Sequence, residues 1–293
     1  MAPASQMSQE GSAKLSHPRS SVRAMALRLP SSLSPSKVTS FKDCALAFRF
    51  SAIDRLPEPP SPWTTKGTLV HRALELLFGE EPEARTVEAA LHHLGVARAD
   101  LADDPDFTDL HLTPEEEHAF FLDAERLVRR YFDLEDPRRI RPIGLELKLE
   151  AQVGTLKLRG IIDRLELDER GDLVVTDYKT GKPPRQNYEQ KSLGGVHFYA
   201  FLCEQLFGQL PSKIQLLYLS EPVAIVARPS EQSTRGLRQR VGAIWTAVER
   251  ACEREDFRPR PSALCAYCAF QSYCPAFGGD PAEVRELVGA GAG

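Results

Sequence analysis

The stretch Leu158–Lys179, LRGIIDRLELDERGDLVVTDYK, decides the fold of this chain. Two runs rich in valine, isoleucine and leucine flank a polar break, Asp168–Asp172, which contains a glycine. This pattern predicts two antiparallel strands joined by a short loop. If the loop is symmetric about Arg170, residues that are equally far from Arg170 in the sequence lie opposite one another in the sheet.

Acidic side chains fall at matching positions on these two strands. Asp163 and Asp177 are equally far from the centre of the loop, so their Cβ atoms should lie roughly 5 Å apart on one face. Side chains alternate between faces with a period of two, so Lys179 shares that face. Two carboxylates this close repel each other, and a divalent cation removes the conflict. The hairpin therefore predicts a metal site beside an ammonium group, unless Asp163 pairs with Arg164 or Arg159 and Asp177 simply ends a strand.

The composition restricts the class of protein. Of 293 residues, 42% are apolar and 27% are charged, which is typical of a soluble globular chain. The net charge of −4 excludes a broadly basic surface, so contacts with a nucleic acid must come from a local patch. No apolar run approaches the ~20 residues of a membrane span, so we expect no membrane partner. Nor does an apolar core follow the basic residues near the N-terminus, which argues against a secretory signal.

The hydrophobic periodicity predicts a mixed α/β fold around one central sheet flanked by helices. We expect a disordered tail at residues 1–30, one domain over 31–279 and a C-terminal tail at 280–293. A proline-rich linker lies at 57–62, and residues 80–112 are expected to form a variable insertion of helices or loops. The expected helices are 36–48, 67–78, 113 to about 134, 187–208 and 241–252. The fourth of these is expected to be interrupted at Gly194–Gly195 and closed by Gly208 as its C-terminal cap. The expected strands are 145–153, the two of the hairpin, 213–220 and 223–227.

Three cysteines near the C-terminus, Cys265, Cys268 and Cys274, form the pattern C-x2-C-x5-C followed by proline. This spacing is typical of a metal site in a reducing compartment, which predicts a cytoplasmic protein. Zinc and an iron–sulfur cluster both fit the spacing, iron–sulfur somewhat better, and both need a fourth ligand. The candidates are Cys44, Cys203, Cys252 and His197. We favour Cys44, near a helix end, because the other two cysteines lie among apolar neighbours in expected helices.

One more residue with possible chemistry is His71, in the expected helix 67–78. Val70, Leu74 and Leu77 form the apolar stripe of this helix, and His71 lies beside it. On its own, such a histidine is usually a structural residue that makes a hydrogen bond.

Together these motifs resemble the PD-(D/E)xK nuclease superfamily, specifically the RecB-like exonuclease domains whose C-terminal cysteine triple holds an iron–sulfur cluster. AddB-type helicase-nucleases and CRISPR adaptation nucleases share this arrangement. The family's G-x-x-x-H helix corresponds to Gly67–His71, its G-x-x-D strand to Gly160–Asp163 and its D-Y-K-T-G strand to Asp177–Gly181. The resemblance covers roughly residues 34–279 and implies a restriction-endonuclease-like core.

The resemblance also implies roles for individual residues. His71, Asp163, Asp177 and the backbone carbonyl of Tyr178 would hold Mg²⁺ or Mn²⁺, and Lys179 would orient or deprotonate the attacking water.

Further residues are assigned by the same resemblance. Glu146 falls where the family often carries an acid. Cys44 and the C-terminal triple match the family's cysteine motif, and this match favours a [4Fe-4S] cluster over zinc. Tyr199 matches the family's helical tyrosine, but Gly195 stands where the family has glutamine. His197 or Gln190 would have to substitute for that glutamine.

The expected function is a metal-dependent DNA exonuclease of repair or recombination, acting on single-stranded DNA or duplex ends. No G-x-x-x-x-G-K-[ST] loop is present, so a separate helicase is the candidate partner. One alternative is a catalytically weak DNA-binding or assembly module, favoured by Gly195 and the acidic net charge but opposed by the intact Asp163, Asp177 and Lys179. Another is a nuclease that acts on RNA.

Overall fold

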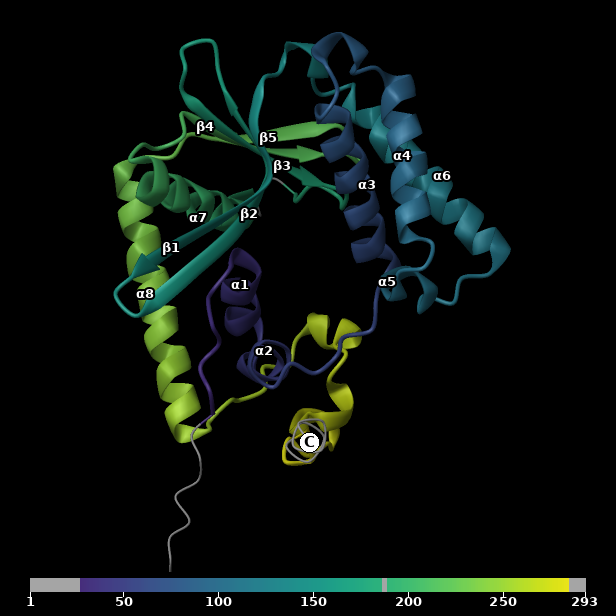
Figure 1. Ribbon diagram of the computed structural model, residues 1–293. Helices are drawn as coiled ribbons and strands as arrows, with labels where there is room; N and C mark the ends of the chain where they lie inside the picture. The colour runs from purple at the N-terminus through teal and green to yellow at the C-terminus, as the bar shows by residue number, and fades with distance from the viewer. Residues whose placement is uncertain (1–26, 186–188, 285–293) are drawn as a thin grey trace, which may run out of the picture.

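The computed structural model describes residues 27–185 and 189–284, apart from the side chains of 189–193. A five-stranded sheet with the order β1-β2-β3-β4-β5 lies between two groups of helices (Figure 1). The strands are β1 Pro142–Val153, β2 Leu156–Leu167, β3 Leu173–Lys179, β4 Lys213–Tyr218 and β5 Val223–Ala227. Strands β3 and β4 are parallel, and all other neighbours are antiparallel. The predicted mixed α/β fold around one sheet is confirmed.

The register of the central hairpin follows the predicted symmetry. Arg164 on β2 pairs with Thr176 on β3, and the pairing continues in step to the loop. Inside the loop, Oδ1 of Asp168 accepts hydrogen bonds of 2.9 and 3.0 Å from two backbone N–H groups. Gly171 has a φ of 82°, a conformation that glycine adopts without steric cost. Local turn chemistry therefore fixes which residues face each other at the far end of the hairpin.

Helices cover both faces of the sheet, with α7 and α8 on one side and α3, α4 and α6 on the other (Figure 1). The helices are α1 Pro35–Asp43, α2 Ala45–Phe48, α3 Pro62–Phe78, α4 Val87–Leu101, α5 Pro105–Thr108, α6 Pro114–Tyr131, α7 Glu189–Phe207 and α8 Glu231–Arg254. Short helical turns are η1 Arg49–Ile53, η2 Pro82–Ala84, η3 Pro137–Arg139, η5 Ala263–Tyr267, η6 Gln271–Tyr273 and η7 Pro275–Phe277. No helix in the described part of the chain is long and apolar enough to cross a membrane.

Each face of the sheet has its own hydrophobic core. Val175 and Leu202 are fully buried in the core under α7 and α8, and Val70 and Leu74 are fully buried under α3, α4 and α6. Full burial of one such side chain contributes about 1.5–3 kcal/mol to folding. The central strands β2 and β3 are packed from both sides, so they form a rigid base for functional groups.

Several helices begin earlier than the periodicity predicts. Helix α3 starts at Pro62 because Ser61 caps it, accepting a hydrogen bond of 3.2 Å from the N–H of Thr64. Helix α8 starts ten residues before the expected 241, because Ser230 is its N-cap. The expected insertion at 80–112 is largely helical, since α4 and α5 lie within it. The first turns of α3 and α8 are polar, so the spacing of apolar residues does not reveal where these two helices begin.

Two expected helices differ in their continuity. The expected helix 36–48 is broken at Cys44, whose extended backbone (φ −158°, ψ 111°) separates α1 from α2. Helix α7, by contrast, runs through Gly194–Gly195 without the expected interruption, and its expected first residue, Asn187, lies outside the described residues. A glycine in a helix costs only about 0.5–1 kcal/mol, which packing against the sheet offsets. The expected C-terminal cap, Gly208, has the left-handed φ of 71°.

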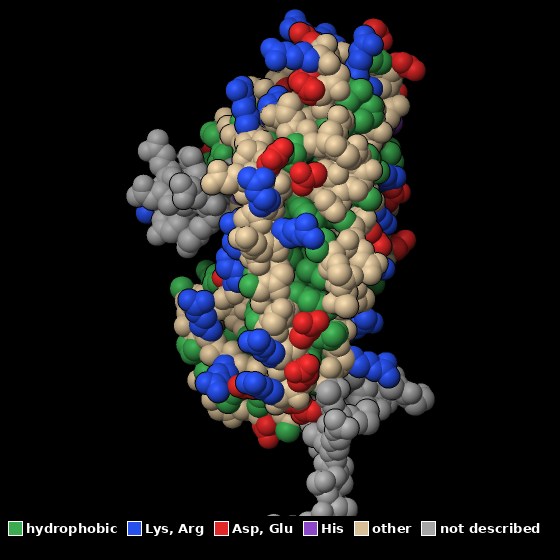
Figure 2. Space-filling view, turned by 90° about the vertical axis from the view of Figure 1, so that its left-hand side faces the viewer, with side chains coloured by type: hydrophobic (Ala, Val, Ile, Leu, Met, Phe, Trp, Pro, Cys, Tyr) green, Lys and Arg blue, Asp and Glu red, His purple; other side chains and the backbone are tan. Residues whose placement is uncertain are grey.

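The predicted tails are described only in part. Residues 27–30 and 280–284 are described, and both segments pack against the domain. The N–H of Leu27 donates to the carbonyl of Cys252 (3.4 Å), and Val284 is fully buried in the core under α7 and α8. Figure 2 views the side of the molecule that carries α8, where basic and acidic side chains are interspersed. This face has no broad basic patch.

Candidate active site

Three carboxylates lie side by side on neighbouring strands. The pairing of β2 with β3 places Asp163 across from Asp177, one step beyond the Arg164–Thr176 pair. The pairing of β1 with β2 brackets Glu146 and Asp163 in the same way, between Leu145–Arg164 and Leu147–Ile162. The row Glu146, Asp163 and Asp177 therefore crosses three strands on one face of the sheet.

The backbone of Glu146 is unusual for a strand. Its φ is 43°, in the left-handed region that non-glycine residues rarely adopt, and β1 has an irregular register nearby at Pro142 and Gly144. Such a conformation costs on the order of 1–3 kcal/mol and persists only where its surroundings impose it. Here it accompanies a carboxylate that lines the cleft beside Asp163.

His71 reaches the same site from α3. Its Nε2 lies 3.1 Å from the carbonyl oxygen of Tyr178, which can only accept, so Nε2 carries the proton. Nδ1 then faces the acids, 3.6 Å from Oδ2 of Asp163 and 3.9 Å from Oε1 of Glu146. A histidine fixed this way presents an unprotonated nitrogen for a cation.

Asp163 and Asp177 have further partners. The N–H of Tyr178 donates a hydrogen bond of 2.6 Å to Oδ2 of Asp163. Lys179 forms an ion pair with Oδ2 of Asp177, and the hydroxyl of Tyr199 on α7 lies 3.5 Å from Oδ1 of Asp177. The structure thus brings together all the residues predicted from the hairpin, with His71, Glu146 and Tyr199. The alternative pairings of Asp163 with Arg164 or Arg159 are absent among the described residues.

The acids of this site are strongly perturbed. Burial and then the charge of Asp177 raise the pKa of Asp163 to about 8. Burial and then the charge of Asp163 raise the pKa of Glu146 to about 7. Burial lowers the pKa of His71. Burial also opposes the charge on Lys179, but the charge of Asp177, its hydrogen bond to Lys179 and the charge of Asp163 together raise the pKa of Lys179. At neutral pH the site therefore holds a neutral imidazole and an ammonium group, and the carboxyls of Asp163 and Glu146 tend to bind protons because compensating charge is lacking.

The donor atoms suit a hard divalent cation. One ligand atom each from His71, Glu146 and Asp163 lies within 4.8 Å of the others. Carboxylate and carbonyl oxygens are the donors that Mg²⁺ prefers, and the added imidazole makes the set suitable for Mn²⁺ too. This group shares Asp163 with the pair predicted from the hairpin, but it contains His71 and Glu146 in place of Asp177.

A cleft of about 1,360 Å³ opens over this site. Its walls come from the β1–β2 hairpin, α1, α7 and α8, and several basic side chains line it: Lys37, Lys42, Lys148, Arg159, Lys179 and Arg240. Gly195 lines the cleft where the resemblance calls for glutamine. Of the proposed substitutes, His197 is not among the described residues that line the cleft, and the side chain of Gln190 lies outside the described residues.

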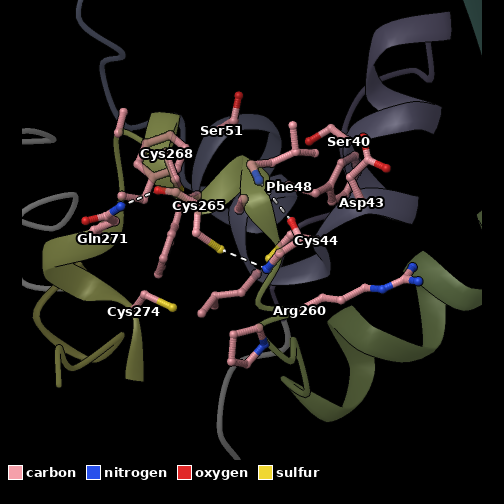
Figure 3. Close-up of a pocket in the computed structure, with 18 of the residues that line it drawn as sticks. Ser40, Asp43, Cys44, Phe48, Ser51, Arg260, Cys265, Cys268, Gln271 and Cys274 are labelled. Atoms are coloured by element: carbon pink, nitrogen blue, oxygen red, sulfur yellow. Dashed lines mark hydrogen bonds between the residues drawn. The ribbon is translucent and has the colours of Figure 1, made fainter. Parts of the chain in front are cut away.

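The C-terminal cysteine triple and Cys44 line a second cavity, of about 380 Å³ (Figure 3). Cys44 lies at the break between α1 and α2 rather than late in one helix, and Cys265, Cys268 and Cys274 lie in the loop that contains η5 and η6. Burial, and then the neighbouring thiols including Cys44, raise the pKa of Cys268. Residues far apart in the sequence therefore meet at one group of thiols.

The remaining two cysteines have a different environment. Cys203 and Cys252 are buried in the core under α7 and α8. Burial raises the pKa of their thiols to about 12 and about 11. They are buried as small apolar side chains, in agreement with the expectation from their helical neighbours.

Arg164 does not make the ion pair with Asp163 that was considered as the alternative to a metal site. It is fully buried on the opposite face of the sheet and binds Glu135 and Glu166 instead of Asp163. The alternation of side chains along β2 was the available signal, because neighbouring residues in a strand cannot share a face.

A model of the PD-(D/E)XK nuclease superfamily matches residues 32–275, which is most of the chain. The chain belongs to this superfamily of nucleases, and its mixed five-stranded sheet flanked by helices is consistent with the fold of the superfamily. Among known proteins, it is 22% identical over 266 residues to the Gene 69 protein of Mycobacterium phage D29, covering 83% of this chain and 96% of the relative. It is also 26% identical over 137 residues to the Gene 69 protein of Mycobacterium phage L5, covering 46% and 45% of the two chains.

Among solved structures, one from Eubacterium rectale, described as a "Putative exonuclease", superposes with a TM-score of 0.51. The two chains share 12% identity, and the match covers 81% of this chain and 86% of the other. At this identity the likeness concerns the fold alone.

Proposed function

We propose that this nuclease is a divalent-cation-dependent exonuclease that hydrolyses DNA during repair or recombination. The row of carboxylates Glu146, Asp163 and Asp177, next to Lys179 in an open cleft, carries this proposal. In this arrangement acidic groups crowd together in a buried place, and a cation relieves their repulsion. The ligands we propose are His71, Asp163 and Asp177, with Glu146 beside them, while the carbonyl of Tyr178 accepts the hydrogen bond from Nε2 of His71 instead of binding the cation.

Each side chain has a definite part in the proposed reaction. A Mg²⁺ or Mn²⁺ ion, when bound, would lower the pKa of a water molecule and polarise the phosphate. Lys179 carries a proton on Nζ and would offset the negative charge that develops on the phosphate oxygens. His71 stays neutral and points Nδ1 at the acids, and Tyr199 helps to hold Asp177.

Basic residues in the cleft support a nucleic-acid substrate. Burial, and then the charges of Arg55 and Arg159, lower the pKa of Lys37. Arg159 also pairs with Glu150 (2.6 Å), and a group of neighbouring cations favours additional negative charge. A phosphate backbone lying along α1 would supply that charge and lead towards the acids. We take single-stranded DNA or a duplex end as the substrate, delivered by a separate helicase.

We also propose that Cys44, Cys265, Cys268 and Cys274 hold a [4Fe-4S] cluster in a reducing, cytoplasmic compartment. The N–H of Ser262 donates to Sγ of Cys265 (3.3 Å), a contact of the kind that stabilises metal-bound thiolates. The pattern C-x2-C-x5-C together with Cys44 favours iron–sulfur over zinc because it resembles that of the exonucleases with a cysteine triple. The cluster would tie the N-terminal helices to the C-terminal loop.

A digest of end-labelled single-stranded DNA with Mg²⁺ or Mn²⁺ tests the proposed function. We expect stepwise loss of nucleotides by the wild type, no cleavage with EDTA, and full cleavage by Asp256→Asn, a change at an exposed residue on the segment after α8. Cleavage of labelled RNA but not of labelled DNA would show that RNA is the substrate. If the wild type binds DNA but cleaves neither substrate with either cation, the chain is the catalytically weak binding module instead.

A further inference from the structure

A buried arginine lies directly behind the acidic site. Arg164 follows Asp163 on β2, so its side chain points to the opposite face of the sheet, where it is 0% exposed. Its guanidinium lies over the ring of Phe78 at 4.7 Å. Arg164 does not line the cleft, so the proposed hydrolysis makes no direct use of it.

The guanidinium uses its donors in a network that ties three elements together. Nε donates to Glu166 (2.6 Å) and Nη2 donates to Glu135 (3.0 Å), so one cation meets two carboxylates. Nη2 also donates to the hydroxyl of Thr176 (3.0 Å), and Nη1 donates to the hydroxyl of Tyr178 (2.9 Å). Both of the latter residues belong to β3. A buried network whose polar groups are satisfied holds a single arrangement of its members.

Stability alone is a poor explanation for this network. Taking charges out of water is costly, and well-packed apolar residues of similar volume often serve stability equally well or better. What the network supplies is orientation of the strand that carries the catalytic groups.

Tyr178 joins the network to the site. Its side chain packs with α3 and α6, while Asp177 and Lys179 on either side of it face the cleft. Its main chain makes two contacts within the site. The N–H donates to Oδ2 of Asp163 (2.6 Å) and the carbonyl accepts from Nε2 of His71 (3.1 Å). A rotation of this residue would therefore move both contacts together.

We propose that Arg164 is a positioning residue: by binding the hydroxyl of Tyr178 from behind the sheet, it fixes the peptide groups that orient Asp163 and His71. The catalytic part of this inference rests on the proposed function, while the structural part does not. Arg164 touches neither the cation site nor the cleft, so its effect is transmitted through Tyr178.

Two tyrosines provide a matched pair of variants. Nη1 of Arg164 donates to the hydroxyls of both Tyr178 (2.9 Å) and Tyr131 (3.4 Å), and both rings are buried in the same core. Only Tyr178 belongs to the strand that carries the site, because Tyr131 lies at the end of α6. Tyr178→Phe and Tyr131→Phe each remove one buried hydroxyl from the guanidinium, and Tyr131→Phe also removes a hydrogen bond to Glu135 (2.7 Å), so it is the more disruptive control for the network itself. Arg164→Lys removes the planar fork but keeps the charge.

The readouts are amide exchange without metal, Mn²⁺ affinity and steady-state kinetics. We expect the N–H of residue 178 to exchange faster in Tyr178→Phe than in Tyr131→Phe, after correction for global stability. We expect only Tyr178→Phe to weaken Mn²⁺ binding and lower kcat, each about tenfold, with KM little changed. If Arg164→Lys folds, it should behave like Tyr178→Phe, and if it does not fold, the tyrosine pair still decides.

The outcomes separate this inference from the proposed function. Equal exchange at residue 178 in the two tyrosine variants would overturn the positioning role, whatever the activity. Equal loss of kcat in both variants would also overturn it, because a merely structural network would give that result. Selective exchange at residue 178 in a protein that never cleaves DNA would support the positioning role and reject the proposed function.

Discussion

Asp163 and Asp177 face each other across β2 and β3, although only 8% and 4% of their surfaces are exposed. In a protein without metal, this pair makes folding depend on pH. Burial and the charge of Asp177 raise the folded-state pKa of Asp163 from 3.8 to about 8. The folded state then binds a proton that the unfolded chain has lost, so this contribution to stability is complete below pH about 4 and disappears as pH rises through about 8.

We therefore expect the Tm in EDTA to fall between pH 7 and pH 9. In this range the imidazole of His71 is largely neutral in both the folded and the unfolded state, because its folded-state pKa is lowered from 6.5. His71 therefore does not offset the expected fall in Tm. Thermal unfolding of wild type and Asp163→Asn gives the comparison, and the variant should show a flatter dependence. A wild-type Tm that rises over this range, or equal slopes in both proteins, would contradict the assigned protonation.

Gly160 leaves room for Tyr199. A Cβ at this position would lie 2.9 Å from Cδ1 of Leu202 and 3.1 Å from Cε1 of Tyr199, the ring whose hydroxyl approaches Asp177. We expect Gly160→Ala to destabilise the fold by about 1–3 kcal/mol and to slow DNA cleavage, because Tyr199 must move. Urea denaturation and the labelled-DNA digest measure the two effects.

Gly95 gives the control for this substitution. It is exposed in α4, and a Cβ there would meet nothing within 4 Å. Gly95→Ala should stabilise the fold by about 0.5–1 kcal/mol and leave cleavage unchanged. A Gly160→Ala protein as active and as stable as Gly95→Ala would show that this close approach has no consequence.

The thiol cavity predicts a coloured protein. Purified without oxygen, the wild type should contain iron and absorb near ~400 nm, and Cys265→Ser should lose most of both. Cys203→Ser, a change to a cysteine buried in the core, should keep its iron even where its Tm falls. Colourless wild-type protein that contains zinc would exclude the cluster.

The central hairpin shows how much of this fold can be predicted from sequence. Its register was predictable because the loop between Asp168 and Asp172 and the period of two are both local properties. The same alternation places Arg164 away from Asp163, although its carboxylate partners, Glu135 on the segment after α6 and Glu166 on β2 itself, depend on tertiary packing. The helix α6, with its capping box of Thr113 and Glu116, was predictable for a similar reason.

Other features of the site depend on long-range contacts that no local pattern encodes. The left-handed backbone of Glu146 accompanies an irregularity in how β1 pairs with β2. The break at Cys44 interrupts a segment whose residues favour one continuous helix, and the residue meets the C-terminal loop only in the folded chain. The early start of α8 brings Arg240 into the cleft, which a helix beginning at 241 would not predict.

Mn²⁺ binding and cleavage, measured together, test the central claim most directly. Paramagnetic resonance titrations of wild type, Asp177→Asn and Lys179→Met should be run alongside single-turnover cleavage of labelled DNA. We predict that Asp177→Asn binds Mn²⁺ about 10–100-fold more weakly and no longer cleaves the DNA. Lys179→Met should keep its Mn²⁺ and lose cleavage, because the ammonium group acts on the reaction rather than on the cation. Unchanged Mn²⁺ affinity and cleavage in Asp177→Asn would contradict a cation shared by carboxylates of neighbouring strands.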